Sequence, residues 1–283
     1  MSDNGLPGKI KPVNVRQVFH DKNPRLASIL PGFVYRYLEK IIHQKEVNDF
    51  LAKHGVKIGL DFVRAAIEDF NVTITVAGEE NLPKDRRCIF ASNHPLGGFD
   101  GMLLMDIMDR YYTDFKFLSN DILMNIVNLH PLFIPINKHG KQAIESAGKL
   151  HEAYLSDTQI VTFPSGLVSR YIHGQVMDLE WKKNFITKAV HYKRDIVPVH
   201  FTGRNSPFFY RLYLIRKFLR IKANLEMFYL VDETFKHRND HLTVTFGKPI
   251  PYCTFDSSKS PLKWAKWVKE QVYGLAGITD VPV

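Results

Sequence analysis

Short apolar runs with high β-propensity alternate with segments of helical length along most of this chain. The eight strand candidates are residues 72–76, 88–91, 115–118, 132–136, 160–163, 196–201, 227–231 and 242–246. Helical patterns fill residues 101–111, 140–155, 181–191, 207–220 and 261–273. This alternation predicts an α/β fold, with a central mixed, partly parallel sheet and helices on both faces.

A helical block precedes the alternating part. Residues 1–24 are polar and basic, which indicates an arm or an extended lead-in. From residue 24 to residue 70 apolar side chains recur at helical spacing, and Pro31 is placed like a first-turn proline. We therefore expect a basic N-terminal arm with a helical extension (residues 1–70) and an α/β domain (residues 71–283).

The charge balance narrows the range of partners. The chain has 38 Lys and Arg against 29 Asp and Glu, a net charge of +9. This surplus favours an anionic partner: nucleic acid, an anionic membrane surface, or a phosphorylated or thioester-carrying substrate. Cys88 and Cys253 are the only cysteines, so neither a disulfide framework nor a zinc site is expected, and a reducing, cytosolic compartment fits best.

No membrane-spanning helix is expected from the sequence. The longest stretch without Asp, Glu, Lys or Arg, residues 122–137, has only 16 residues and contains two prolines. A spanning helix needs about 20 mostly apolar residues. The N-terminus also lacks the apolar region of a secretory signal.

The segment after residues 88–91 carries the first chemical signal. His94 and Asp100 flank a turn that contains Gly97 and Gly98, and Asn93 could help to hold this turn. The carboxylate can fold back onto one imidazole nitrogen and leave the other as a general base of fixed tautomer. Alternatively, Asp100 only charges the N-terminus of the following helix, and His94 is an ordinary loop histidine.

Two further strand ends carry groups suited to anions. Lys138 follows residues 132–136, where a cation could bind phosphate or carboxylate, although solvated loop lysines are common. Ser165 and Gly166 follow residues 160–163 in a tight turn, with Arg170 close behind. This turn could expose backbone N–H groups as an anion-binding nest, or it could be an ordinary turn.

A fourth strand candidate, residues 196–201, contains a proline. Pro198 predicts a sheet edge or a bulge near a ligand. His200 alternates with apolar neighbours, and we interpret it as a core or rim histidine rather than a second base.

In this order, the four segments resemble the four sequence blocks of the PlsC-type glycerolipid (lysophospholipid) acyltransferases. The matching segments are Asn93-His94 through Asp100, residues 134–138, residues 163–170 and residues 197–199. The resemblance covers roughly residues 70 to 251.

Three departures distinguish this chain from the family pattern. Five residues, not four, separate His94 from Asp100, Ser165 replaces a glutamate, and Lys138 replaces the usual arginine. Together with Gly203-Arg204-Asn205-Ser206, these features resemble the hemolysin-like bacterial branch, which includes enzymes associated with ornithine or glycine lipids.

The resemblance implies an O-acyltransferase of membrane lipid biosynthesis. It would move a fatty acyl group from acyl-carrier protein or acyl-CoA to the hydroxyl of lysophosphatidic acid or a lyso-amino-acid lipid. In a His-Asp dyad, His94 would act as general base and Asp100 would orient it. The implied substrate-binding residues are Asn93, Lys138, Ser165, Gly166 and Arg170. No metal and no cofactor are implied beyond the thioester co-substrate.

Two segments indicate contact with an anionic membrane surface. Residues 207–222 place apolar side chains on one helical stripe (Phe208, Leu212, Ile215, Leu219) and basic ones on another (Arg216, Lys217, Arg220). The helix predicted at residues 31–42 is the second candidate, and for both the alternative is a core-packed helix with a basic solvent face. We expect a peripheral enzyme at the cytoplasmic face of the inner membrane.

Two other functions stay open at this stage. Ser165 and the longer spacing between His94 and Asp100 would also fit a non-catalytic or hydrolytic lipid-binding homologue. A nucleic-acid-binding function rests on charge and aromatic content alone, without a recognised motif. Nucleic acid is therefore not an expected partner.

Overall fold

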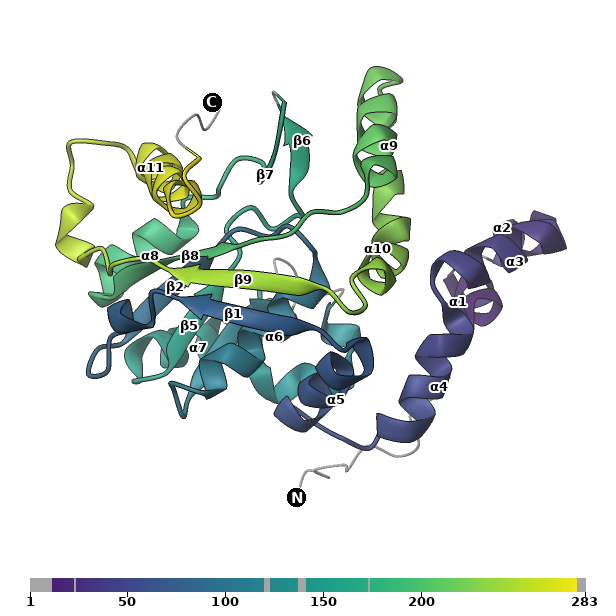
Figure 1. Ribbon diagram of the computed structural model, residues 1–283, viewed down its shortest axis with the longest axis horizontal. Coiled ribbons are helices and arrows are strands. Elements are labelled where there is room, and N and C mark those ends of the chain that lie inside the picture. Colours follow the sequence, from purple (N-terminus) through teal and green to yellow (C-terminus); the bar gives the residue numbers. More distant parts are fainter. Residues whose placement is uncertain (1–11, 23, 120–122, 137–140, 173, 279–283) are drawn as a thin grey trace.

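The computed structural model describes residues 12–22, 24–119, 123–136, 141–172 and 174–278. Seven strands form one sheet in the order β1-β9-β8-β2-β5-β3-β4 (Figure 1). The strands are β1 (Thr73–Ala77), β2 (Cys88–Ser92), β3 (Phe115–Ser119), β4 (Phe133–Pro135), β5 (Gln159–Thr162), β8 (Asp195–Phe201) and β9 (His241–Phe246). All neighbours are parallel except β8 and β9, which confirms the predicted mixed sheet.

Helices cover both faces of the sheet, as the sequence predicted. In Figure 1, α5 (Leu60–Phe70) and α6 (Gly98–Asp109) lie below it, and α8 (Asn184–Tyr192) and α11 (Pro261–Gly274) lie above it. Alternate residues of one strand serve the two cores, since Phe90 packs in the α5–α6 core and Ile89 in the α8–α11 core. Burial on both faces explains why the central strands are continuous apolar runs.

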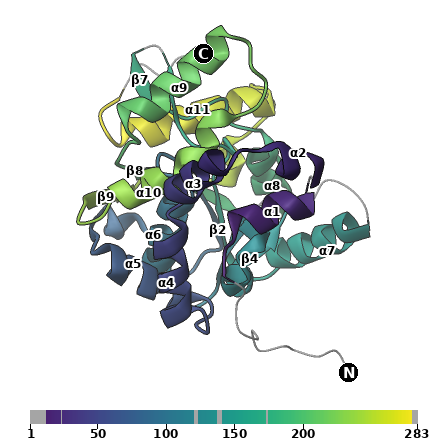
Figure 2. The same cartoon turned by 90° about the vertical axis from the view of Figure 1, so that its right-hand side faces the viewer.

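Four N-terminal helices extend from this body as an arm, which faces the viewer in Figure 2. They are α1 (Val15–Lys22), α2 (Pro24–Ile29), α3 (Gly32–Ile41) and α4 (Gln44–His54). Of the two alternatives for residues 1–24, an arm or an extended lead-in, the described part forms an arm, and it is mostly α1. The arm contacts the body at Tyr37, whose hydroxyl lies 2.5 Å from that of Tyr229, and at His43, whose Nε2 lies 3.0 Å from Asp232.

The segment between β5 and β9 holds the main departures from prediction. The strand expected at residues 227–231 is wrong, because these residues end a 3₁₀ turn, η4 (Leu225–Tyr229), and begin α10 (Leu230–Lys236). A short apolar run does not distinguish strand from helix, and acidic residues in the first turn, here Asp232 and Glu233, favour a helix.

A small hairpin, β6 (Arg170–Ile172) and β7 (Gln175–Met177), was not predicted. The remaining elements are α7 (Lys141–Leu155), α9 (Pro207–Phe218) and the 3₁₀ turns η1 (Glu79–Asn81), η2 (Leu123–Asn125), η3 (Val127–Leu132) and η5 (Tyr252–Thr254). Among the described residues, no helix is both long and apolar enough to cross a membrane.

Pro198 lies in β8, an interior strand between β2 and β9, so the expected sheet edge is wrong. The expected bulge is present. Between the Val199–Phe246 and Ile196–Ile250 pairs, the chain opposite β8 has one residue more than β8 itself. The proline therefore sits where the ladder with β9 is already interrupted.

Candidate active site

His94 and Asp100 meet at the carboxyl end of β2. The His94 Nδ1 atom lies 2.8 Å from Asp100 Oδ1, and the Asp100 side chain has no exposed surface. Asp100 Oδ2 accepts a hydrogen bond of 2.8 Å from the backbone N–H of Leu96. Asp100 thus combines both interpretations made from the sequence, since it lies in the first turn of α6 and also holds the imidazole ring.

The turn between the two residues depends on Gly97. This glycine precedes α6 with φ +78° and ψ −137°, a conformation that side chains other than glycine rarely adopt. A Cβ added here would lie 3.3 Å from a methyl group of Val168. Gly97 therefore allows a five-residue connection to return Asp100 to His94.

The His94 ring is largely buried. It stacks on Phe163 at a centroid distance of 4.2 Å, and 14% of its side chain is exposed. Burial alone lowers the pKa of His94, but the charge of Asp100, its hydrogen bond and the charge of Asp178 outweigh burial and a smaller opposing effect of Arg170. The pKa of His94 is therefore above its ordinary value, so the ring readily accepts a proton.

Asn93 joins two strand ends. Its Nδ2 donates to the carbonyl of Phe201 at 2.9 Å, and its Oδ1 accepts from the N–H of Phe201 at 2.6 Å. The side chain is buried and replaces a rung of sheet hydrogen bonding between β2 and β8. This geometry fixes the residue before His94, where the turn begins, to the end of β8.

The loop after β5 satisfies its polar groups internally. The Ser165 hydroxyl donates to the carbonyl of Leu167 at 2.7 Å, and the N–H of Gly166 donates to the carbonyl of Phe163 at 2.9 Å. These two expected anion-binding groups are engaged within the loop. A cation lies against it instead, because a Cβ added to Gly166 would lie 2.6 Å from Nζ of the exposed Lys182.

Arg170 is a buried side chain with protein partners. Its guanidinium lies 3.1 Å from Glu226, which also pairs with Arg216 at 2.8 Å. The rings of Phe209 and Tyr213 lie on the same guanidinium, with centroids at 5.1 and 5.4 Å. Direct contact of Arg170 with a substrate does not fit this arrangement, in which it instead joins β6 to α9 and η4.

Two other expectations concern Lys138 and His200. Lys138 lies outside the described residues. His200 is buried on β8, and burial lowers its pKa to about 4, as fits a neutral core histidine rather than a second base.

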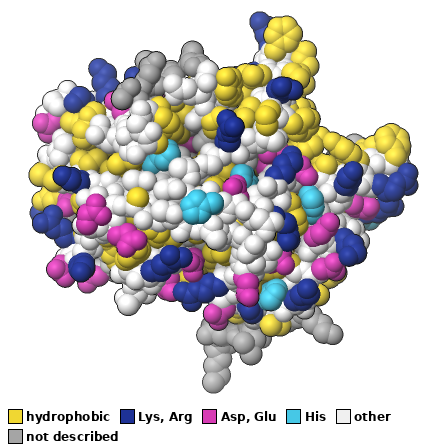
Figure 3. Space-filling model, in the orientation of Figure 1, with side chains coloured by type: hydrophobic (Ala, Val, Ile, Leu, Met, Phe, Trp, Pro, Cys, Tyr) yellow, Lys and Arg dark blue, Asp and Glu magenta, His cyan; other side chains and the backbone are white. Residues whose placement is uncertain are grey.

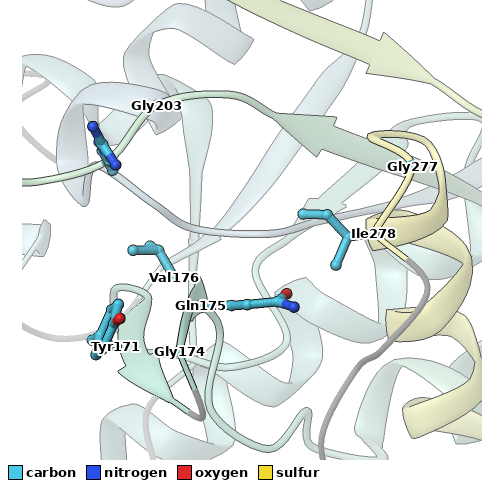
Figure 4. A pocket seen from close by; sticks show the side chains of 8 residues that line it. Tyr171, Gly174, Gln175, Val176, Gly203, Gly277 and Ile278 are labelled. Carbon is cyan, nitrogen blue, oxygen red and sulfur yellow. The ribbon is translucent and has the colours of Figure 1, made fainter.

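A cavity of about 520 Å³ lies beside the β6–β7 hairpin (Figure 4). Tyr171 and Val176 of the hairpin line it together with Gly203, Arg204 and Ile278. Neither member of the dyad contributes to this lining. The lining alone therefore does not assign this cavity to the dyad.

Comparison with known sequences identifies the family. The sequence profile of a family described as acyltransferase matches residues 17–281, nearly the whole chain. The chain belongs to the acyltransferase family. This result confirms the resemblance to PlsC-type enzymes and identifies the protein as an acyltransferase.

Two curated relatives of this acyltransferase are similar along nearly their whole length. The lyso-glycine lipid O-acyltransferase of Bacteroides thetaiotaomicron is 49% identical over 264 residues, which are 93% of this chain and 97% of that protein. The enzyme of the same name from Phocaeicola vulgatus is 45% identical over 93% of this chain and 95% of its own length. Among solved structures, PlsC from Thermotoga maritima aligns with a TM-score of 0.45 at 17% identity, covering 89% of this chain and 95% of that one.

Sequence reasoning did not find two charged residues of this acyltransferase, one bonded to the backbone of His94 and one against the loop after β5. Asp178 accepts a hydrogen bond of 3.1 Å from the backbone N–H of His94, and Lys182 lies against Gly166. Neither belongs to a recognisable motif, and both follow the unpredicted β6–β7 hairpin. Among the described residues, no group of three or more His, Cys, Asp and Glu side chains could hold a metal ion.

Proposed function

We propose that this acyltransferase is a lysolipid O-acyltransferase of membrane lipid biosynthesis. It transfers a fatty acyl group from acyl-carrier protein or acyl-CoA to the hydroxyl of a lysolipid. The observation that carries the proposal is the 2.8 Å contact between His94 Nδ1 and the buried carboxylate of Asp100, in a chain of the acyltransferase family. Since both curated relatives are named for lyso-glycine lipid, we take a lyso-amino-acid lipid, with glycine first, as the acceptor.

The dyad supports direct transfer without an acyl-enzyme. With Nδ1 held by Asp100, the Nε2 atom of His94 takes the proton of the acceptor hydroxyl as its oxygen attacks the thioester carbonyl. The new C–O bond forms, the C–S bond breaks, and the imidazolium returns the proton to the leaving thiolate. General base assistance of this kind contributes about 10²–10⁴-fold to the rate.

Lys182 is suited to the head group of such an acceptor. A glycine that is acylated on its nitrogen carries a free carboxylate, which a cation at the site would bind. The Lys182 ammonium lies against Gly166, in the loop after β5 that also holds Phe163, whose ring stacks on His94. We therefore assign to Lys182 the anion contact that the sequence pattern suggested for Arg170.

The acceptor lies in a bilayer, and two parts of the surface are suited to contact one. Figure 3 shows hydrophobic side chains over the upper part of α9 and again at the end of the arm, with lysines and arginines beside both. Phe218 and Leu219 are 87% and 57% exposed at the end of α9, and Phe33 is 65% exposed on α3. Exposed apolar side chains flanked by cations favour an anionic membrane surface.

One of the three basic residues of 207–222 that were expected to face the membrane is buried. Arg216 is buried against Glu226 and cannot face lipid headgroups, whereas Lys217 and Arg220 are exposed. We propose peripheral attachment at the cytoplasmic face of the inner membrane, because acyl-carrier protein and acyl-CoA thioesters are made in the cytoplasm.

An acyl-transfer assay tests the enzymatic proposal. Purified wild-type protein and His94→Ala would each be given a donor with a radiolabelled acyl chain, either acylated acyl-carrier protein or acyl-CoA. The acceptors would be a set of lysolipids that includes lyso-glycine lipid and lysophosphatidic acid. We expect diacyl product from wild type with one of the donors and none above background from His94→Ala. Equal activity of the two proteins would refute the dyad, and release of free fatty acid without acylated lipid would indicate hydrolysis instead.

Vesicle sedimentation tests the membrane contact. Vesicles of phosphatidylcholine with and without phosphatidylglycerol would be mixed with wild type, with Phe218→Ser/Leu219→Ser, and with Ile144→Ser as a control. Ile144 is 78% exposed on α7, away from α9. We expect only the α9 variant to lose binding to the anionic vesicles, and equal binding of all three proteins would refute this role of α9.

A further inference from the structure

Asp178 is a buried carboxylate that holds the backbone of His94. It follows β7 and has no exposed surface. Its Oδ1 accepts hydrogen bonds from the N–H of His94 at 3.1 Å and from the Ser169 hydroxyl at 2.6 Å. Its Oδ2 accepts a bond from the Trp181 indole N–H at 2.9 Å. Three donors thus converge on one carboxylate next to the dyad.

The backbone of Asp178 is itself fixed by α11. Its N–H donates to the hydroxyl of Tyr273 at 2.6 Å, and its carbonyl accepts a bond of 2.7 Å from the Lys269 ammonium. Both partners are buried residues of the same helix. Asp178 therefore connects the backbone of His94 to α11.

The sheet does not hold His94, because β2 ends at Ser92. Two hydrogen bonds from the hairpin region hold it instead. Ser169, just before β6, donates its N–H to the carbonyl of His94 at 2.8 Å, and Asp178, just after β7, accepts the N–H of His94 at 3.1 Å. Both backbone groups of His94 are thus bound by the two ends of one hairpin.

We infer that Asp178 is a positioning residue, which fixes the backbone of His94 and places a second carboxylate beside the dyad. This inference rests on the proposed acyl transfer. A rigid backbone keeps Nε2 aimed at the acceptor hydroxyl, and a second carboxylate stabilises the imidazolium that forms when His94 takes the proton.

The charges that face His94 come from three elements. Asp100 on α6 and Asp178 after β7 favour the protonated ring, whereas Arg170 on β6 opposes it. The pKa of Asp178 is itself raised by burial, against the opposing hydrogen bonds of Ser169 and Trp181 and the charge of His94. The His94 N–H, the Ser169 hydroxyl and the Trp181 N–H all donate to the Asp178 carboxylate, which suits its ionised form.

The test needs a variant that removes the charge without leaving two donors face to face. In Asp178→Asn, the amide NH₂ would meet the Trp181 N–H if its oxygen stayed on His94. The double variant Asp178→Asn/Trp181→Phe removes this conflict and keeps the bond to the N–H of His94. Trp181→Phe alone and Ser169→Ala, each of which removes one donor to Asp178 and leaves its carboxyl group in place, are the controls.

Two measurements are made on these proteins: kcat and KM for acyl transfer, and titration of ¹⁵N-histidine NMR signals, with that of His94 assigned by His94→Ala. In the double variant we expect kcat to fall about 10- to 100-fold at unchanged KM and the pKa of His94 to fall. In either control the pKa of His94 should fall less than in the double variant, because the Asp178 carboxyl group stays in place. A wild-type value of either kcat or the His94 pKa in the folded double variant overturns the inference.

An unfolded double variant and a wild-type protein without acyl-transfer activity have different meanings for the inference. If circular dichroism shows that the double variant is unfolded, Tyr273→Phe, which removes the hydroxyl that accepts the N–H of Asp178 and keeps the Asp178 carboxyl group, should lower kcat at unchanged KM, and a wild-type kcat would then overturn the inference. If the wild-type protein transfers no acyl group, the proposed function fails. The NMR titration does not depend on turnover and still decides whether Asp178 controls His94.

Discussion

Replacement of Asp100 by Asn tests the dyad most directly. In the structure the two carboxylate oxygens have different partners, the His94 ring through Oδ1 and the Leu96 N–H through Oδ2. The Leu96 N–H can only donate, so the amide oxygen of the Asp100→Asn side chain must face it. The amide NH₂ then faces His94 and donates to Nδ1, which forces the ring proton onto Nε2. The nitrogen that should accept the substrate proton is thereby blocked.

The size of the effect follows from these contacts. The opposite orientation of the amide would leave the Leu96 N–H facing another donor, at a cost of about 1–3 kcal/mol, so the inactive tautomer dominates. Loss of the general base should then lower kcat by about 10²–10⁴-fold. The KM for the lysolipid should change little, because Asp100 is fully buried and cannot touch the acceptor.

Steady-state acyl transfer with varied lysolipid measures both constants. Asp109→Asn is the matched control, because it makes the same change at the other end of α6, where Asp109 pairs with the exposed Arg64. Circular dichroism would show that both variants are folded. Wild-type kcat in a folded Asp100→Asn protein would refute the assignment of His94 as a general base oriented by Asp100.

Three further predictions follow from the charges described above. The kcat/KM of wild type should rise with pH and level off only above the ordinary histidine pKa of 6.5, because the raised pKa of His94 keeps the ring protonated to higher pH. A pH–rate profile with its midpoint below 6.5 would contradict this. Glu226→Gln should lower the free energy of unfolding, measured by urea denaturation, by about 3–5 kcal/mol, since it leaves two buried guanidiniums without their carboxylate. The control Glu39→Gln breaks the exposed pair with Arg16, and its loss should be below about 1 kcal/mol. Lys182→Glu should raise the KM for lyso-glycine lipid about tenfold, which corresponds to about 1.4 kcal/mol of binding free energy. The control Lys183→Glu makes the same charge change at the next residue and should leave the KM unchanged. Equal KM values for the two variants would exclude Lys182 from head-group binding.

Local sequence patterns predicted the parts of the molecule that depend on neighbouring residues. The central strands are buried on both faces, so each is a short apolar run, and seven of the eight strand candidates are present. The contact between His94 and Asp100 spans only six positions and is formed by one glycine-containing turn. Short-range geometry of this kind can be inferred from residue types and spacing alone.

Long-range contacts decided the parts that were not predicted. Arg170 pairs with Glu226, 56 positions away, and this pairing makes it a buried structural group rather than a surface cation. The bond between His94 and Asp178 spans 84 positions. No spacing rule joins such residues, because the fold of the intervening chain determines whether they meet.

The place of β1 in the sheet also has a consequence for how the chain folds during synthesis. Among the strands of the described residues its one neighbour is β9, and hydrogen-bonded residues on the two strands lie 168 positions apart. At about 5–20 residues per second, β1 leaves the ribosome roughly 10–30 seconds before its partner exists. The five mutually parallel strands, complete at Phe201, can associate in that interval, while β1 waits. A chain interrupted before His241 would keep both β1 and one side of β8 unpaired, and open strand edges of this kind are where aggregation begins.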